Sequence, residues 1–225
     1  MCILRALPPV LLDFLLFMLY NNAIIYFFMD DHQEQGIEQV PKPGFWGRFF
    51  REIWEFSKIV VVSLAIVLPI RLFIAQPFIV RGASMEPNFQ NGEYLIIDEV
   101  TYRFSEPERG EIIVFRYPKD PSQFFIKRII GLPGDTVTIA AGSVRISNAA
   151  DPDGFDLQEA YLPDSLVTAP SSETVIGEDE YFVLGDNRPF SSDSRRWGVL
   201  EEDFFVGRAW LRLWPVTGFG VIEHQ

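Results

Sequence analysis

The chain has 225 residues, 48% of them hydrophobic, and a formal net charge of -12 at pH 7. This length suits one ordinary domain with an appendage, and the high hydrophobic content favours a membrane segment over a simple soluble globule. The acidic balance disfavours nucleic acid as a partner, because surfaces that bind nucleic acid are basic.

The residue types that usually drive catalysis are scarce. The single cysteine, Cys2, excludes an intramolecular disulfide and a thiolate metal cluster, and we expect neither a metal nor an organic cofactor. Neither His32 nor His224 stands where a Ser-His-Asp triad would hold its histidine firmly. A serine nucleophile in this chain would therefore need a different base.

The first third of the chain divides into segments of different character. Residues 1–29 are apolar but interrupted by polar residues, so they are a first transmembrane helix, an uncleaved hydrophobic leader or an extension before a true start at Met29. Residues 30–58 are predicted to be cytosolic or interfacial, because aromatic residues interleave with arginines near their end. Residues 59–75 are predicted to form a transmembrane helix roughly 26 Å long.

From residue 76 to residue 225 the pattern changes to short β-rich runs separated by turn signals. The predicted strands are 94–100, 111–117, 124–130, 136–139, 144–147, 181–184 and 208–214. We therefore expect a mainly β, antiparallel domain. Residues 148–178 are rich in Asp, Pro and Ser, and we interpret them as a surface excursion with little core of its own.

Ser84 is the first candidate nucleophile. It follows Gly82 and Ala83 and precedes Pro87, which predicts an irregular turn, and this stretch alone is better explained as a turn serine. A hydroxyl becomes a useful nucleophile only when a neighbouring base removes its proton. The search for that base leads to Lys127.

Lys127 lies in a predicted strand among large apolar residues, so burial would lower its pKa. Bringing that pKa from about 10.4 to about 7 requires roughly 4.6 kcal/mol. Documented buried lysines have pKa values as low as about 5 to 6, so a shift of this size is attainable. The alternative is a structural lysine paired with Glu111 or Asp135. From the residues alone this alternative stays open.

Four ordered motifs resemble the boxes of type I signal peptidases. They are 82–87 (GASMEP), 109–115 (RGEIIVF), 126–135 (IKRIIGLPGD) and 185–195 (GDNRPFSSDSR). The resemblance covers roughly residues 76–214 and implies an antiparallel β catalytic domain like those of signal peptidases and self-cleaving repressors, behind an N-terminal transmembrane anchor.

The same resemblance implies a serine endopeptidase that removes signal peptides from exported preproteins through a Ser-Lys dyad. Its partners would be signal peptides and membrane lipid. We expect a monomer in the bacterial cytoplasmic membrane, crossing it once or twice, with the catalytic domain on the extracytoplasmic side. A modest excess of basic residues before the predicted span favours this orientation.

By resemblance, Ser84 is the nucleophile, Lys127 is the general base and Ser191 orients the lysine. Asp193 and Arg195 would form a supporting ion pair. Asp186 would pair with Arg128. The Gly82 N–H is a candidate second oxyanion donor beside the Ser84 N–H. The family positions that line shallow substrate pockets correspond to Phe78, Val80 and Ile126, for which plain strand core is left open.

Three other classes of protein share part of this pattern. A self-cleaving repressor would keep the dyad but needs a cleavable linker and usually a DNA-binding domain, which this acidic, helix-poor sequence does not offer. A non-catalytic, membrane-anchored β domain that binds exported proteins remains the alternative. Penicillin-binding enzymes are disfavoured because Pro87 occupies the lysine position of their S-x-x-K motif.

Overall fold

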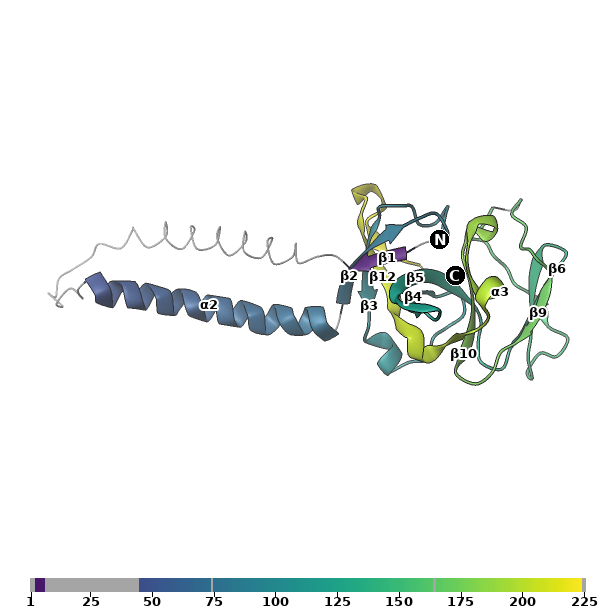
Figure 1. Ribbon diagram of the computed structural model, residues 1–225, viewed down its shortest axis with the longest axis horizontal. Coiled ribbons are helices and arrows are strands. Elements are labelled where there is room, and N and C mark those ends of the chain that lie inside the picture. Colours follow the sequence, from purple (N-terminus) through teal and green to yellow (C-terminus); the bar gives the residue numbers. More distant parts are fainter. Residues whose placement is uncertain (1–2, 7–44, 74, 164, 224–225) are drawn as a thin grey trace. The chain divides into compact units, whose positions relative to one another are not determined.

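The computed structural model describes residues 3–6, 45–73, 75–163 and 165–223 (Figure 1). These belong to two compact units, one of residues 1–6 and 71–225 and the other of residues 7–70. Most of the predicted segments 1–29 and 30–58 lie outside the described residues.

Helix α2 spans Phe45–Phe73, so it begins inside the predicted interfacial segment and continues through most of the predicted span. The helical backbone continues across residues 58 and 59, and the border between an interfacial segment and a membrane span at this point stays a prediction. Large apolar side chains of the first turns are exposed, among them Trp46 at 67% and Trp54 at 65%. Within the described residues, no helix meets the length and hydropathy needed to cross a membrane.

The larger sheet has the strand order β1-β2-β3-β12-β4-β5-β10-β11, with β13 paired to β12. All of its pairings are antiparallel. Its strands are β1 (Ile3–Ala6), β2 (Ala75–Arg81), β3 (Tyr94–Asp98), β4 (Ile112–Tyr117), β5 (Asp120–Gly131), β10 (Glu180–Leu184), β11 (Leu200–Glu201), β12 (Phe205–Trp214) and β13 (Gly220–Val221). Because β1 pairs with both β2 and β5, the first six strands of this order close into a ring.

The smaller sheet has the order β8-β7-β6-β9 and lies beyond β10 in Figure 1. Its strands are β6 (Thr136–Ala140), β7 (Ser143–Ser147), β8 (Phe155–Asp156) and β9 (Ser172–Val175). Two of these strands come from residues 148–178, and Ile176 just after β9 is buried in the core of this sheet. Both residues of β8 are exposed and β9 is at most half-buried, so the segment adds little core beyond Ile176. The two strands themselves were not predicted, because they are too short and polar to show a strand pattern.

The centre of the larger sheet is buried on both faces. Ile112 and Val114 of β4 belong to one hydrophobic cluster, whereas Ile113 and Phe115 belong to another. Such a strand is a continuous apolar run in the sequence, since both of its faces pack against core. On the adjacent strand β5, Lys127 interrupts the same kind of run.

The seven predicted strands are present as β3, β4, β5, β6, β7, β10 and β12. Strands β1 and β2 were not predicted. Strand β1 lies in the predicted apolar segment 1–29, and β2 begins at Ala75, inside the predicted transmembrane helix. In both places a mainly apolar stretch hides the change of conformation, because periodicity alone does not separate buried strand from apolar helix.

Candidate active site

Ser84 lies in the turn that follows β2. The chain reverses at Gly82, whose φ of 97° suits glycine. Asn187 holds this turn from the 185–195 motif: its backbone N–H donates to the Ser84 carbonyl at 3.0 Å, and its Nδ2 donates to the Ala83 carbonyl at 2.9 Å. The side chain of Ser84 is fully buried. The nucleophile turn is therefore fixed by a segment about a hundred residues away in sequence.

Lys127 reaches Ser84 from strand β5. Its Nζ lies 2.7 Å from Ser84 Oγ and 2.7 Å from the Ile126 carbonyl oxygen, and its side chain is fully buried. Glu111 and Asp135, the partners of the structural alternative, form ion pairs with Arg208 and Arg109 instead. The arrangement places an amine in direct contact with a hydroxyl, away from solvent.

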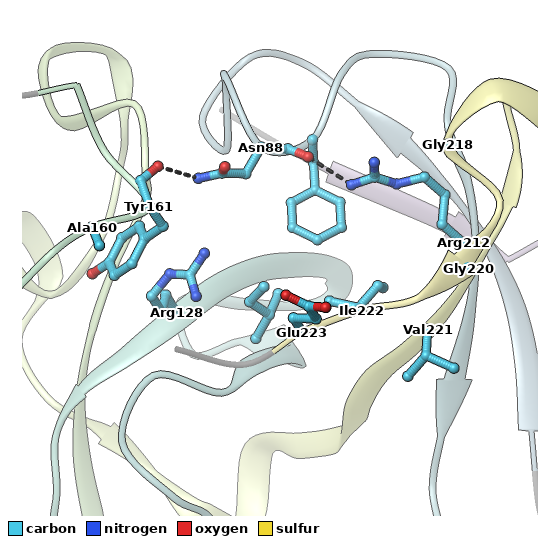
Figure 2. Close-up of a pocket in the computed structure, with 12 residues that line it drawn as sticks. Asn88, Arg128, Ala160, Tyr161, Arg212, Gly218, Gly220, Val221, Ile222 and Glu223 are labelled. Atoms are coloured by element: carbon cyan, nitrogen blue, oxygen red, sulfur yellow. Dashed lines mark hydrogen bonds between the residues drawn. The ribbon is translucent and has the colours of Figure 1, made fainter.

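Arg128 and Asp186 form a buried bidentate ion pair beside this contact. Arg128 Nε lies 3.0 Å from Asp186 Oδ1, and Nη2 lies 2.8 Å from Oδ2. Asn88 Nδ2 donates to Asp186 Oδ2 at 2.7 Å and to the Tyr161 carbonyl at 3.0 Å, the second bond being visible in Figure 2. The Arg128–Asp186 pair thus joins β5 to the 185–195 motif, as expected. Asn88, just after the Ser84 turn, is hydrogen-bonded to the same pair through Asp186.

The ring of Tyr161 covers Arg128, with the guanidinium carbon 3.7 Å from the ring centroid (Figure 2). Burial raises the pKa of Tyr161, so the phenol stays neutral against the cation. These residues line one end of a cavity of about 430 Å³ whose far end includes Arg212 and Glu223. Neither Asn88 nor Tyr161 was singled out as a site residue from the sequence, because each contact spans a long sequence separation.

The Asp193–Arg195 pair supports the same motif. Arg195 Nε lies 2.8 Å from Asp193 Oδ1, and Nη2 lies 2.7 Å from Oδ2. Asp193 Oδ2 also accepts a hydrogen bond from the Gly185 N–H at 3.1 Å. The structure therefore brings the two residues together as expected, and links them to the backbone that touches the nucleophile turn.

Two expectations about hydrogen bonds are wrong. The buried Ser191 hydroxyl has no hydrogen-bond partner in the part of the chain that the structure describes, so it does not bond Lys127. It lies against Gly185, where an added Cβ would be 2.2 Å from Ser191 Oγ. The Gly82 N–H donates to Asn91 Oδ1 at 3.0 Å and is therefore occupied rather than available to an oxyanion.

Phe78, Val80 and Ile126 do not line an open pocket. All three are fully buried in one hydrophobic cluster that also contains Leu4 of β1. Their burial fits the strand-core alternative, and their role as substrate lining stays a prediction.

Gly185 is a tightly packed position. A Cβ there would lie 2.5 Å from the Ser84 carbonyl oxygen and 2.2 Å from Ser191 Oγ, far inside normal contact distance. We expect Gly185→Ala to displace the Ser84 turn and to lower kcat for the expected peptide cleavage by about 100-fold, since a misplacement of about 1 Å has that cost. Steady-state kinetics measure this effect. Gly220→Ala, where an added Cβ meets no atom within 4 Å, is the control; equal kcat values for both variants would contradict the proposed packing constraint.

The fold and the site together define a class of protein: a β domain that buries a lysine against a serine. A profile of the family described as "Signal peptidase, peptidase S26" matches residues 53–214. A probable signal peptidase I-2 from Synechocystis sp. is 38% identical over 76% of this chain and 78% of its own length. A signal peptidase I from Leptolyngbya laminosa is 36% identical over 75% of this chain and 83% of its own length.

A crystal structure of a signal peptidase I from Enterococcus faecalis V583 is 31% identical and covers 46% of this chain and 97% of its own, with a TM-score of 0.39, too low to bear on the fold. The sequence matches are sufficient. The chain belongs to the signal peptidase family, peptidase S26, and is an enzyme of that family.

Proposed function

We propose that this chain is a serine endopeptidase that cleaves N-terminal signal peptides from exported preproteins, with Ser84 as nucleophile and Lys127 as general base. The observation that carries the proposal is the 2.7 Å contact between Lys127 Nζ and Ser84 Oγ in a fully buried setting. The relatives named signal peptidase I support the substrate class. The direct test is cleavage of a preprotein at its signal peptide, followed by identification of the new N-terminus.

The proposed chemistry begins with a neutral lysine, which complete burial favours over the ammonium form. Lys127 takes the Ser84 hydroxyl proton while the oxygen attacks the scissile carbonyl carbon. The resulting ammonium gives a proton to the leaving amine, and an acyl-enzyme ester remains. Water then attacks the ester with Lys127 again accepting a proton, which releases the signal peptide and restores Ser84.

The oxyanion of the tetrahedral intermediate needs hydrogen-bond donors. The Ser84 N–H is the proposed donor, because among the described residues it makes no hydrogen bond of its own. Asn187 supports this role by binding the Ser84 carbonyl from the opposite side of the residue. The Asn91 contact with the Gly82 N–H steadies the preceding turn rather than the oxyanion.

We further propose that residues 59–75 anchor the enzyme in the bacterial cytoplasmic membrane and that residues 76–225 act outside it. Exposed apolar side chains on α2, including Ile59 at 46%, Val61 at 63% and Val62 at 57%, support a lipid environment for that helix. Alkaline extraction should leave the full chain in the membrane. Protease added outside intact spheroplasts should digest the β domain, and full protection of that domain would contradict the proposed topology.

The Ser191→Ala variant tests whether the Ser191 hydroxyl contributes to stability. Its hydroxyl is buried without a partner in the described part of the chain, so Ser191→Ala removes no hydrogen bond. We expect the free energy of unfolding to stay within about 1 kcal/mol of the parent or to rise. Urea denaturation measures this; a loss of about 2 kcal/mol or more would show that the hydroxyl is bonded in solution.

A further inference from the structure

Strand β1 occupies the position between the two strands that carry the proposed dyad. Strand β2 leads into the Ser84 turn, and β5 carries Lys127. On one side Ile3 pairs with Arg81 and Leu4 with Val80; on the other side Ile3 pairs with Phe125 and Leu4 with Phe124. Four residues from the start of the chain thus fill a strand position next to the site, as Figure 1 shows for β1 and β2.

Leu4 is the apolar anchor of this strand. Its side chain is only 2% exposed and belongs to the hydrophobic cluster that contains Phe78, Val80, Met85 and Ile126. Burial of the Leu4 side chain in this cluster stabilises the docked position of β1 through the hydrophobic effect. Without Leu4, this end of the cluster would be open to an apolar side chain from another extended segment.

The direction of β1 matters for catalysis. Strands β2 and β5 both run toward the dyad, because β2 ends three residues before Ser84 and Phe125 lies two residues before Lys127. Strand β1 is antiparallel to both, so its amino end lies toward the dyad. A substrate peptide bound in this position would be cut at its carboxyl end, so that end must point toward Ser84. Strand β1 points its amino end toward Ser84 and therefore runs opposite to a productive substrate.

We propose that residues 3–6 are a built-in competitor that fills the peptide-binding strand position and must leave before an extended peptide with an apolar side chain can pair with β2. This inference rests on the proposed function. Recognition by strand addition uses main-chain hydrogen bonds for affinity and side-chain pockets for specificity. Strand β1 has the main-chain pairing, and its Leu4 is buried in the apolar cluster. Because the strand is reversed, it is held without being cleaved.

The kinetic test uses the full chain in detergent micelles and a preprotein substrate. Leu4→Glu places a charge in the apolar cluster and releases β1, so we expect KM to fall about tenfold with kcat unchanged; that is the effect when a tethered competitor fills the site in about nine molecules of ten. Leu4→Met, which conserves volume, should keep the parental KM. Val175→Glu, at a side chain 72% exposed in the smaller sheet, is the matched control for an added carboxylate.

A cross-link tests the position of β1 independently of folding defects. Arg5 and Ile79 are Cα partners across β1 and β2. In a Cys2→Ser background, Arg5→Cys with Ile79→Cys should form a disulfide, because directly opposed strand residues lie within bonding range. We expect the oxidised enzyme to lose at least nine-tenths of its cleavage and to regain it on reduction. A control pair of Arg5→Cys with Val175→Cys should not cross-link.

The outcomes separate this inference from the proposed function. If the disulfide fails to form, or if it forms and cleavage is unchanged, β1 is not a competitor and the inference is overturned while the peptidase assignment stands. If no variant cleaves the preprotein, including Leu4→Glu and the reduced cross-link variant, the proposed function itself is overturned.

Discussion

Replacing Ser84 by alanine should lower kcat for signal-peptide cleavage by about 10⁴- to 10⁶-fold, the range seen when a serine nucleophile or its base is removed. Lys127→Ala should have a loss of the same size, since the two side chains lie 2.7 Å apart and act on one proton. The double variant should be no slower than the slower single variant, because the dyad acts as a unit. Product formation from a purified preprotein measures all three.

The β4–β5 hairpin supplies matched controls for this prediction. Ser122 and Lys119 are exposed residues of the same hairpin that carries Lys127, and their alanine variants should keep parental kcat. Ser84→Ala should also keep the far-UV spectrum of the parent, which separates lost chemistry from lost fold. Cleavage by Ser84→Ala or Lys127→Ala at more than about one hundredth of the parental rate would contradict the assignment.

Arg128→Met should destabilise the β domain by about 3 to 5 kcal/mol, because it leaves the buried Asp186 carboxylate without its cation. The two side chains are 3% and 1% exposed, so solvent cannot replace the lost partner. Urea denaturation followed by tryptophan fluorescence measures the free energy of unfolding. The double variant Arg128→Met with Asp186→Leu should lose less than the sum of the single variants.

The exposed pair Arg145–Asp156 is the control for this second prediction. Its side chains are 47% and 63% exposed, and Arg145→Met should change the free energy of unfolding by about 1 kcal/mol or less. Equal losses for Arg128→Met and Arg145→Met would show that the buried pair does not hold β5 to the 185–195 motif.

The positions of seven strands could be predicted, because most strands of this fold carry a recognisable local pattern. The run around β4 is apolar on both faces, and turn signals such as Asn91-Gly92 bound its neighbours. Strands β8 and β9 carried no such pattern, since they are short and half-exposed. Strand β1 was hidden in an apolar segment whose pairing partners lie more than seventy residues away.

The proposed dyad followed from the resemblance to signal peptidases, but its surroundings did not. The resemblance implied Ser84 and Lys127, and the structure places their side chains in contact. The bond from Asn91 to the Gly82 N–H and the unpartnered Ser191 hydroxyl depend on side-chain directions in turns, which a linear pattern does not encode. Phe78 and Val80 share a buried cluster with Leu4, which lies more than seventy residues earlier in the chain.

Acylation of Ser84 is the most direct measurement of the central claim. The full chain would be incubated with a penem, a β-lactam that acylates lysine-activated serines, and the labelled residue located by peptide mass spectrometry. The account predicts one covalent adduct on Ser84 that is absent from both Ser84→Ala and Lys127→Ala. An enzyme that cleaves preprotein yet carries its adduct on another residue, or that is labelled equally without Lys127, would contradict it.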